Sequence, residues 1–464
     1  MKSEVLSMKK QMKTILTLVV VATALAGCSS GPAANTSAKP KSTGPVSLTF
    51  WHAMGGSNEE VVKKMVQNFN ETVGKEKGIT ITPVFQGSYA DLLKKVKAAV
   101  QAKNEKDYPD IVQIPASDTS YIKDVPAVIW AQDLLAKDPS FKVTDIEPNT
   151  LAGFSFKGKQ VGIPFANSTI LLYYNKNLFK EAGLDPNKPP QTIDELGKYA
   201  AKMTKKSGSQ VNQWGFSVTP DQYQLSSWIG MQGAYIGNNK NGRADYMTAV
   251  EFDTNGAMKR FLTEWKKAVD SGGIQTGTDV KADEEFAAGK LAMFVTSTAA
   301  LKGTLAKVAD KFEVGTAFLP KVNETDKGGV AVGGSALYIM NRGDKAASDA
   351  AWEFLKYGIT PESQFAWHTG TGYFPVNTKT YELPQMKEHL TKNPLFKTAI
   401  EQLHASSSET QEPMGPVSGE FSQAMREETL NYVQNKKSID QAITDMANAS
   451  NKALKEYNRA NNIK

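Results

Sequence analysis

From residue 46 to about residue 114, the apolar and polar positions follow the pattern of an α/β protein. Alternating or continuous apolar runs predict three strands, at Val46–Trp51, Ile79–Phe85 and Asp110–Ile114. Between the first two, an apolar stripe recurs at helical spacing, at Val62, Met65, Val66 and Phe69. We expect this helix to begin at Ser57 with a capping box to Glu60, and a second helix to span Leu92–Ala102. The order strand, helix, strand, helix, strand indicates a parallel sheet.

The middle of the chain carries a different signal. Ile170–Tyr174 is a continuous apolar run, which predicts a strand that is buried on both faces. A small polar patch, Asn167–Thr169, comes directly before this run. A short helix follows and ends near Gly183, and Thr192 is placed to cap the next helix. Polar patch, strand and helix in this order are typical of a connection between two parts of an α/β protein.

Similar units recur towards the C-terminus. A helix that ends at Gly289 leads into a strand that closes at Ser297, and a glycine pair opens the predicted strand Gly333–Met340. The segment Asn212–Gly233 is rich in aromatic residues. These side chains belong to a core, or one or two of them line a ligand site and stack on ligand carbons. Ser438 is expected to cap the last helix.

The N-terminus predicts export. Residues 1–27 combine basic residues with an apolar run of 12 residues, Ile15–Ala26, which is too short to cross a bilayer. The run ends in Leu25-Ala26-Gly27-Cys28, the arrangement of a bacterial lipoprotein signal, so we expect Cys28 to be lipidated. Residues 28–45 are rich in small residues, lysine and proline, and predict a flexible tether.

The charge, the cysteine content and the histidine spacing exclude several structural and functional features. Cys28 is the single cysteine, so an intrachain disulfide is excluded. Residues 1–27 hold four lysines and one glutamate, a net of +3, which leaves +3 of the formal +6 for the rest. A charge this small predicts no nucleic-acid partner. The four histidines show no metal-ligand spacing, and we expect neither a metal nor a cofactor.

Five blocks together resemble a known family. Their residues are Phe50–Met54, Gln86–Tyr89, Asp110–Gln113, Asn167–Tyr174 and Thr371–Pro375. The chain from Val46 onward is similar to the extracellular solute-binding proteins of ABC importers, and within them to those for glycerol-3-phosphate and glycerophosphodiesters. The resemblance implies a two-lobed α/β fold with a ligand cleft between the lobes. It implies a first lobe of residues 46–160 and 300–360 and a second of 161–299 and 361–464.

The resemblance also implies a ligand shell. Its residues, carried over by motif, are Tyr89, Ser168, Ser297, Gly334 and Tyr373. Three positions depart from the family pattern. Ala116 stands where the family has an acidic residue for glycerol hydroxyls, and Val417 stands where it has a phosphate-binding arginine. Ile193 replaces a tryptophan that follows the double proline. Because arginine is the usual bidentate phosphate ligand, we expect a neutral sugar to bind more tightly than glycerol-3-phosphate. Tyr89, Tyr373 and Trp214 or Trp228 would then supply aromatic surface.

The expected function is therefore a lipid-anchored binding protein on the extracellular face of a bacterial membrane. It would act as a monomer, bind a sugar or a glycerol phosphate, and deliver it to ABC permease subunits. The alternative is a secreted carbohydrate-active enzyme such as a glycoside hydrolase. That enzyme needs two carboxylates facing one cleft, and the implied shell contains none.

Overall fold

The computed structural model describes residues 44–277 and 280–463. Residues 1–27, Cys28 and most of the predicted tether lie outside the described residues. These described residues belong to one compact unit. The described residues contain two six-stranded sheets and a two-stranded ribbon, which confirms the mixed α/β class. None of the helices in the described ranges is long and apolar enough to cross a membrane.

The first sheet has the order β2-β1-β3-β14-β4, and β7 also pairs with β14. Its strands are β1 (Val46–His52), β2 (Ile79–Phe85), β3 (Ile111–Pro115), β4 (Val128–Ile129), β7 (Ile163–Ser168) and β14 (Gly333–Met340). The strands β2, β1 and β3 are parallel, as the sequence predicts, whereas β14 runs antiparallel to its neighbours. We call this sheet and the helices packed on it the first lobe.

The second sheet has the order β11-β10-β12-β8-β13, and β9 also pairs with β10. Its strands are β8 (Ile170–Asn175), β9 (Lys205–Ser207), β10 (Gln210–Ser217), β11 (Ile274–Gln275), β12 (Leu291–Ser297) and β13 (Val314–Ala317). The strands β10, β11 and β12 are parallel, and β8 is antiparallel to both β12 and β13. We call this sheet and its helices the second lobe. The separate ribbon pairs β5 (Ser155–Phe156) with β6 (Lys159–Gln160).

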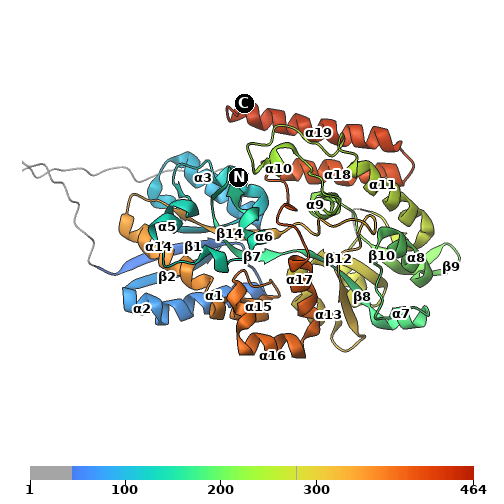
Figure 1. Cartoon of the computed structure of the whole chain (residues 1–464), viewed down its shortest axis with the longest axis horizontal. Helices are drawn as coiled ribbons and strands as arrows, with labels where there is room; N and C mark the ends of the chain where they lie inside the picture. The colour runs from blue at the N-terminus through green and yellow to red at the C-terminus, as the bar shows by residue number, and fades with distance from the viewer. Residues whose placement is uncertain (1–43, 278–279, 464) are drawn as a thin grey trace, which may run out of the picture. The chain divides into compact units, whose positions relative to one another are not determined.

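Helices surround both sheets (Figure 1). Those up to the start of the second sheet are α1 (Ser57–Glu71), α2 (Val73–Lys77), α3 (Tyr89–Ala102), α4 (Thr119–Ile122), α5 (Ala131–Lys137) and α6 (Pro148–Gly153). The next group is α7 (Lys176–Glu181), α8 (Ile193–Met203), α9 (Gln222–Met231), α10 (Asn238–Gly242), α11 (Ala257–Ala268), α12 (Ala282–Ala287) and α13 (Leu301–Val308). The last group is α14 (Lys345–Gly358), α15 (Pro361–Thr371), α16 (Pro384–Lys392), α17 (Pro394–His404), α18 (Ser418–Val433) and α19 (Ile439–Ala460).

The strand β8 is buried on both faces, which explains its continuous apolar sequence. Ile170, Leu172 and Tyr174 point into one hydrophobic cluster, together with residues of α8, α11 and α19. Leu171 and Tyr173 point into another, together with residues of α12 and α13. The first sheet is likewise covered on both faces, because successive residues of β14 alternate between two clusters.

The chain passes from the first sheet to the second at Thr169. The backbone N–H of Thr298 donates to the carbonyl oxygen of Thr169 at 2.7 Å, and the N–H of Thr169 donates to Oγ1 of Thr298 at 3.2 Å. Both threonines are buried. This pair therefore fixes the ends of β7 and β12 against each other, and it places Ser168 and Ser297 directly before the crossing.

Two strands and one helix lie in a different lobe from the one predicted for them. β7 lies in the first sheet, so the chain changes sheet after Ser168 instead of at 160. The strand β13 lies in the second sheet, although residues 300–360 were assigned to the first lobe. The helix α15, predicted for the second lobe, packs on α1, and the two are adjacent in Figure 1 in orange and blue. Short apolar strands such as β13 carry no signal of which sheet they join.

Asp110, directly before β3, links β1 to the segment that follows β14. Its substitution therefore tests what stabilises the first sheet. Its buried carboxylate accepts a hydrogen bond from the N–H of Thr49 at 2.8 Å and two from Nη1 of Arg342, each at 3.1 Å. We expect Asp110→Ala to lower the free energy of unfolding by about 3 kcal/mol, because it leaves these donors without an acceptor. Urea denaturation measures the change. Asp107→Ala, an exposed neighbour, is the control, and equal stability of the two variants would contradict the prediction.

Candidate ligand-binding site

The first half of the candidate site is a hydrogen-bonded network in the first lobe. Tyr89 is the first residue of α3, which Ser88 and Asp91 hold in place through a capping box. The Tyr89 hydroxyl donates to Oγ of Ser335 at 3.1 Å, and Nε2 of Gln113 donates to the same oxygen at 2.7 Å. The amide oxygen of Gln113 in turn accepts from the N–H of Ala53 at 3.0 Å. The ends of β1, β3 and β14 therefore orient Tyr89.

Tyr373 joins this network from the end of α15. Gly372 has φ 95° and ends the helix, which turns the chain so that Tyr373 packs on Trp367 with ring centroids 5.6 Å apart. The two phenols are neighbours because, in addition to the larger effect of burial, Tyr373 raises the pKa of Tyr89 and Tyr89 lowers the pKa of Tyr373. Burial raises the pKa of both phenols, so both remain neutral and can donate and accept hydrogen bonds.

The second half of the site centres on Tyr223 near the start of α9. Burial raises the pKa of the Tyr223 phenol, whereas the hydroxyls of Ser297 and Ser168 lower this pKa. Tyr373 also acts on the pKa of Tyr223, so Tyr223 lies near the first network. Tyr223 belongs to the aromatic segment that the sequence marked as core or ligand-lining, and it is the residue there that contacts the predicted shell.

The glycine pair at the start of β14 lies between the two halves. Gly334 pairs with Asn167 and Gly333 pairs with Ser168. A Cβ added to Gly334 would lie 2.0 Å from the carbonyl oxygen of Ala166, and its φ of 93° also disfavours other residues. The structure thus brings together all five residues that the resemblance implied.

Glu412 is a member of this neighbourhood that the sequence did not indicate. It lies in the connection between α17 and α18, where Gln411 pairs with Val332. A Cβ added to Gly333 would lie 2.7 Å from Oε1 of Glu412 and 3.0 Å from Cε2 of Tyr223. The carboxylate therefore sits against the glycine pair beside Tyr223.

Burial raises the pKa of Glu412 to about 7. The nearby guanidinium of Arg243 lowers this pKa, whereas the negative charges of Asp221 and Asp118 raise it. Burial also raises the pKa of Asp118 to about 6. Glu412 therefore adds one carboxylate beside the implied shell, and it comes from a loop far along the chain.

Ala116 and Val417, the two positions that the resemblance aligned with the family's acidic residue and arginine, are both buried in hydrophobic clusters. Ala116 directly follows Pro115, which pairs with Ser335. Arg426 forms an ion pair with Asp221, with Nη2 and Oδ2 3.0 Å apart. Trp228 is fully buried and stacks on Phe261, so it is a core residue and not a ligand platform.

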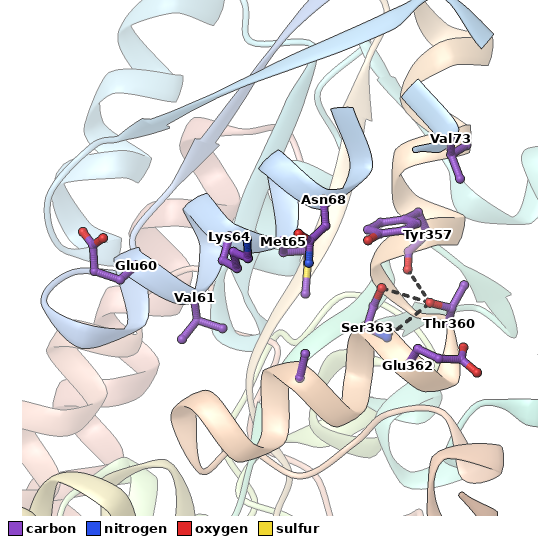
Figure 2. Close-up of a pocket in the computed structure, with 11 residues that line it drawn as sticks. Glu60, Val61, Lys64, Met65, Asn68, Val73, Tyr357, Thr360, Glu362 and Ser363 are labelled. Atoms are coloured by element: carbon purple, nitrogen blue, oxygen red, sulfur yellow. Dashed lines mark hydrogen bonds between the residues drawn. The ribbon is translucent and has the colours of Figure 1, made fainter. Parts of the chain in front are cut away.

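A separate surface pocket of about 640 Å³ lies between α1 and the start of α15 (Figure 2). Its apolar lining comes from Val61, Met65, Val73, Tyr357 and Ala366. Polar groups, including the hydrogen-bonded Thr360 and Ser363, complete it (Figure 2). None of the residues of the candidate site lines this pocket.

Comparison with known proteins identifies the class. The family described as bacterial extracellular solute-binding protein matches residues 64–398. This is more than half of the chain, so the protein belongs to that family. It is a solute-binding component of an ABC importer and not an enzyme, as the resemblance implied.

The sn-glycerol-3-phosphate-binding periplasmic protein UgpB of Salmonella typhimurium is 31% identical over 369 residues, which cover 77% of this chain and 80% of that protein. Among solved structures, a cyclic alpha-maltosyl-1,6-maltose binding protein from Arthrobacter globiformis has a TM-score of 0.73 at 24% identity, over 89% of this chain and 100% of that one. UgpB from Mycobacterium tuberculosis in complex with glycerophosphocholine also has a TM-score of 0.73, at 19% identity, over 89% and 99% of the two chains. These structures establish the two-lobed fold.

The raised pKa of Glu412 predicts how stability depends on pH. The folded protein binds this proton more tightly than the unfolded chain, whose carboxyl has an ordinary pKa of 4.5. The contribution is therefore fully present below pH 4.5 and is lost as the pH rises through about 7. We expect Glu412→Gln to match the wild type at pH 4 and to exceed its unfolding free energy by about 3 kcal/mol at pH 8.

Melting curves of the protein without added solute, recorded from pH 4 to 8, measure this difference. Glu420→Gln is the control, because Glu420 is exposed on α18. A constant offset between the Glu412→Gln variant and the wild type over the whole pH range would show that Glu412 titrates normally.

Proposed function

We propose that this protein captures a sugar or a glycerol-phosphate-type solute between Tyr89 and Tyr373 on one side and Ser168 and Ser297 on the other. The observation that carries the proposal is the convergence of four hydroxyl side chains, from four separate segments, around the glycine pair. Hydroxyls and exposed backbone N–H groups suit sugar hydroxyls and phosphate oxygens alike. Hinge closure of the two lobes would complete the binding surface, as in other two-lobed binding proteins.

We further propose that a neutral sugar binds more tightly than glycerol-3-phosphate. The resemblance aligns Ala116 and Val417 with the family's acidic and arginine ligands, and both side chains are packed in hydrophobic clusters. A buried phosphate requires paired donors, preferably from arginine. A glycan requires hydroxyl partners and aromatic surface, which Tyr89, Tyr223 and Tyr373 supply.

Delivery to a membrane permease follows from this role. We propose that the protein acts as a monomer, is held at the extracellular face of the membrane through lipidated Cys28, and passes its solute to the permease subunits of an importer. The signal-like sequence around Cys28 and the tether-like composition of residues 28–45 support the anchoring.

Calorimetry tests the ligand class and the site together. We expect a maltooligosaccharide or mannooligosaccharide to bind more tightly than glycerol-3-phosphate or glycerophosphocholine. Tyr89→Phe and Tyr373→Phe should each weaken that binding about tenfold, because each loses a hydrogen bond in a site shielded from water. Submicromolar binding of glycerol-3-phosphate with no response to any glycan would contradict the preference.

Tyr235→Phe provides the matched control. It deletes a phenolic hydroxyl that bonds to Glu409 in another part of the second lobe. If this variant lost as much affinity as Tyr89→Phe and Tyr373→Phe, the effect would come from general destabilisation and the proposed site would be wrong.

Cys28→Ser tests the anchor. In a bacterial host, the variant should leave the membrane fraction and appear in the soluble fraction, because it cannot carry the acyl chains that hold a lipoprotein. Immunoblots of the two fractions measure the change, and Ser30→Ala serves as the control. A variant that stays with the membrane would exclude Cys28 as the anchor.

A further inference from the structure

Glu412 has an unusual environment for a carboxylate. The residue is 9% exposed. Its backbone carbonyl oxygen accepts a hydrogen bond from Nη1 of Arg243 at 2.6 Å. Within residues 44–277 and 280–463, however, neither carboxylate oxygen accepts a hydrogen bond from another residue. The carboxylate oxygens are not among the fully enclosed polar atoms of the described residues that lack a partner, so water or the hydroxyl of a solute can reach them. Because a charged acceptor without a donor is unfavourable, a donor from outside the chain would stabilise this carboxylate.

Arg243 does not supply that donor. Its guanidinium donates to four backbone carbonyl oxygens, those of Ala152 at 3.0 Å, Gly153 at 3.2 Å, Asn241 at 3.4 Å and Glu412 itself. The positive charge of Arg243 offsets part of the charge of Glu412 through space, but its N–H groups are directed at the backbone. The carboxylate thus keeps its acceptor capacity.

The position of this carboxylate points to the solute site. Oε1 lies against Gly333, and the ring of Tyr223 lies against the same glycine. Gly333 in turn pairs with Ser168, and, against the larger effect of burial, the hydroxyls of Ser297 and Ser168 both lower the pKa of the Tyr223 phenol. A Cβ at position 333 would collide with both groups, so glycine is what allows Glu412 and Tyr223 to pack this closely against the start of β14.

Charges of both signs surround Glu412. Among these charges, the positive charge of Arg243 has the largest effect on it, and the negative charges of Asp221 and Asp118 act in the opposite direction. Arg426 is already paired with Asp221, and Arg243 is committed to backbone oxygens. A phosphate group that entered here would meet acceptors and negative charge, whereas a hydroxyl group would donate to them.

We propose that Glu412 is a specificity-determining residue, whose carboxylate accepts hydrogen bonds from the hydroxyls of an uncharged, polyhydroxylated solute and disfavours solutes that carry phosphate. This inference rests on the proposed function, since it assumes that the solute lies between Tyr89 and Ser297. It assigns the preference for an uncharged solute to a residue outside the five blocks that carry the family resemblance.

Glu412→Gln separates the charge of this group from its shape. The amide keeps the size of the side chain and removes the negative charge. We expect it to weaken binding of the preferred glycan at least tenfold, as loss of a charged acceptor does. Binding of glycerol-3-phosphate should stay unchanged or become tighter, so the ratio of the two affinities falls. A structural defect alone would weaken both probes together.

Glu409→Gln is the matched control. It removes the same charge three residues away, from a carboxylate that pairs with Lys240 on the surface. Titration calorimetry with maltotriose, mannotriose and glycerol-3-phosphate gives the affinities at pH 8, where Glu412 is ionised. The control should bind each probe as the wild type does.

The outcomes separate this inference from the proposed function. Glycan binding that Glu412→Gln leaves unchanged would overturn the inference while the proposed function stands. Tight glycerol-3-phosphate binding that the variant loses would also overturn it, because Glu412 would then favour the phosphate solute. If the wild type bound none of the three probes, the proposed function would fail and the inference would fail with it.

Discussion

The mutual hydrogen bonds of Thr169 and Thr298 are the constraint on which the site depends. Buried backbone groups must find partners, and at a point where the chain leaves a sheet the regular ladder no longer supplies them. Here each threonine satisfies the other, and Nε2 of Gln402 from α17 adds a bond to the carbonyl oxygen of Ile170 at 2.7 Å. Because both strands end at this pair, the serines before it face the same space from two different segments.

Local sequence patterns predicted the elements well wherever burial on both faces or side-chain capping decided the structure. The run Ile170–Tyr174 became β8, and Thr192 and Ser438 cap α8 and α19 as expected. Ser57 was wrong as a cap, because Gly56 occupies that position without a side-chain bond. Capping depends on the backbone angles of the loop before the helix, which the local pattern does not determine.

The candidate site likewise contains residues that the sequence could indicate and a residue that it could not. Tyr89, Ser168 and Tyr373 lie in motifs with recognisable neighbours, so the sequence indicated them and the structure brings them together. Glu412 stands in a loop without periodicity or a motif, and its burial comes from segments far away in the chain. Trp228 illustrates the opposite case, since its aromatic character is equally consistent with core and site until its packing on Phe261 is known.

The position of β14 in the first sheet bears on the order in which the protein can fold. This strand separates β3 from β4 and β7, yet it comes after all strands of the second sheet. During synthesis β1, β2 and β3 are made first, and the outer edge of β3 stays unpaired until residue 340 has been added. Contacts over such sequence distances form slowly, because a long loop must close before they are gained. The first sheet therefore stays incomplete until most of the chain has been made, and its strands cannot protect one another from unwanted pairing before then.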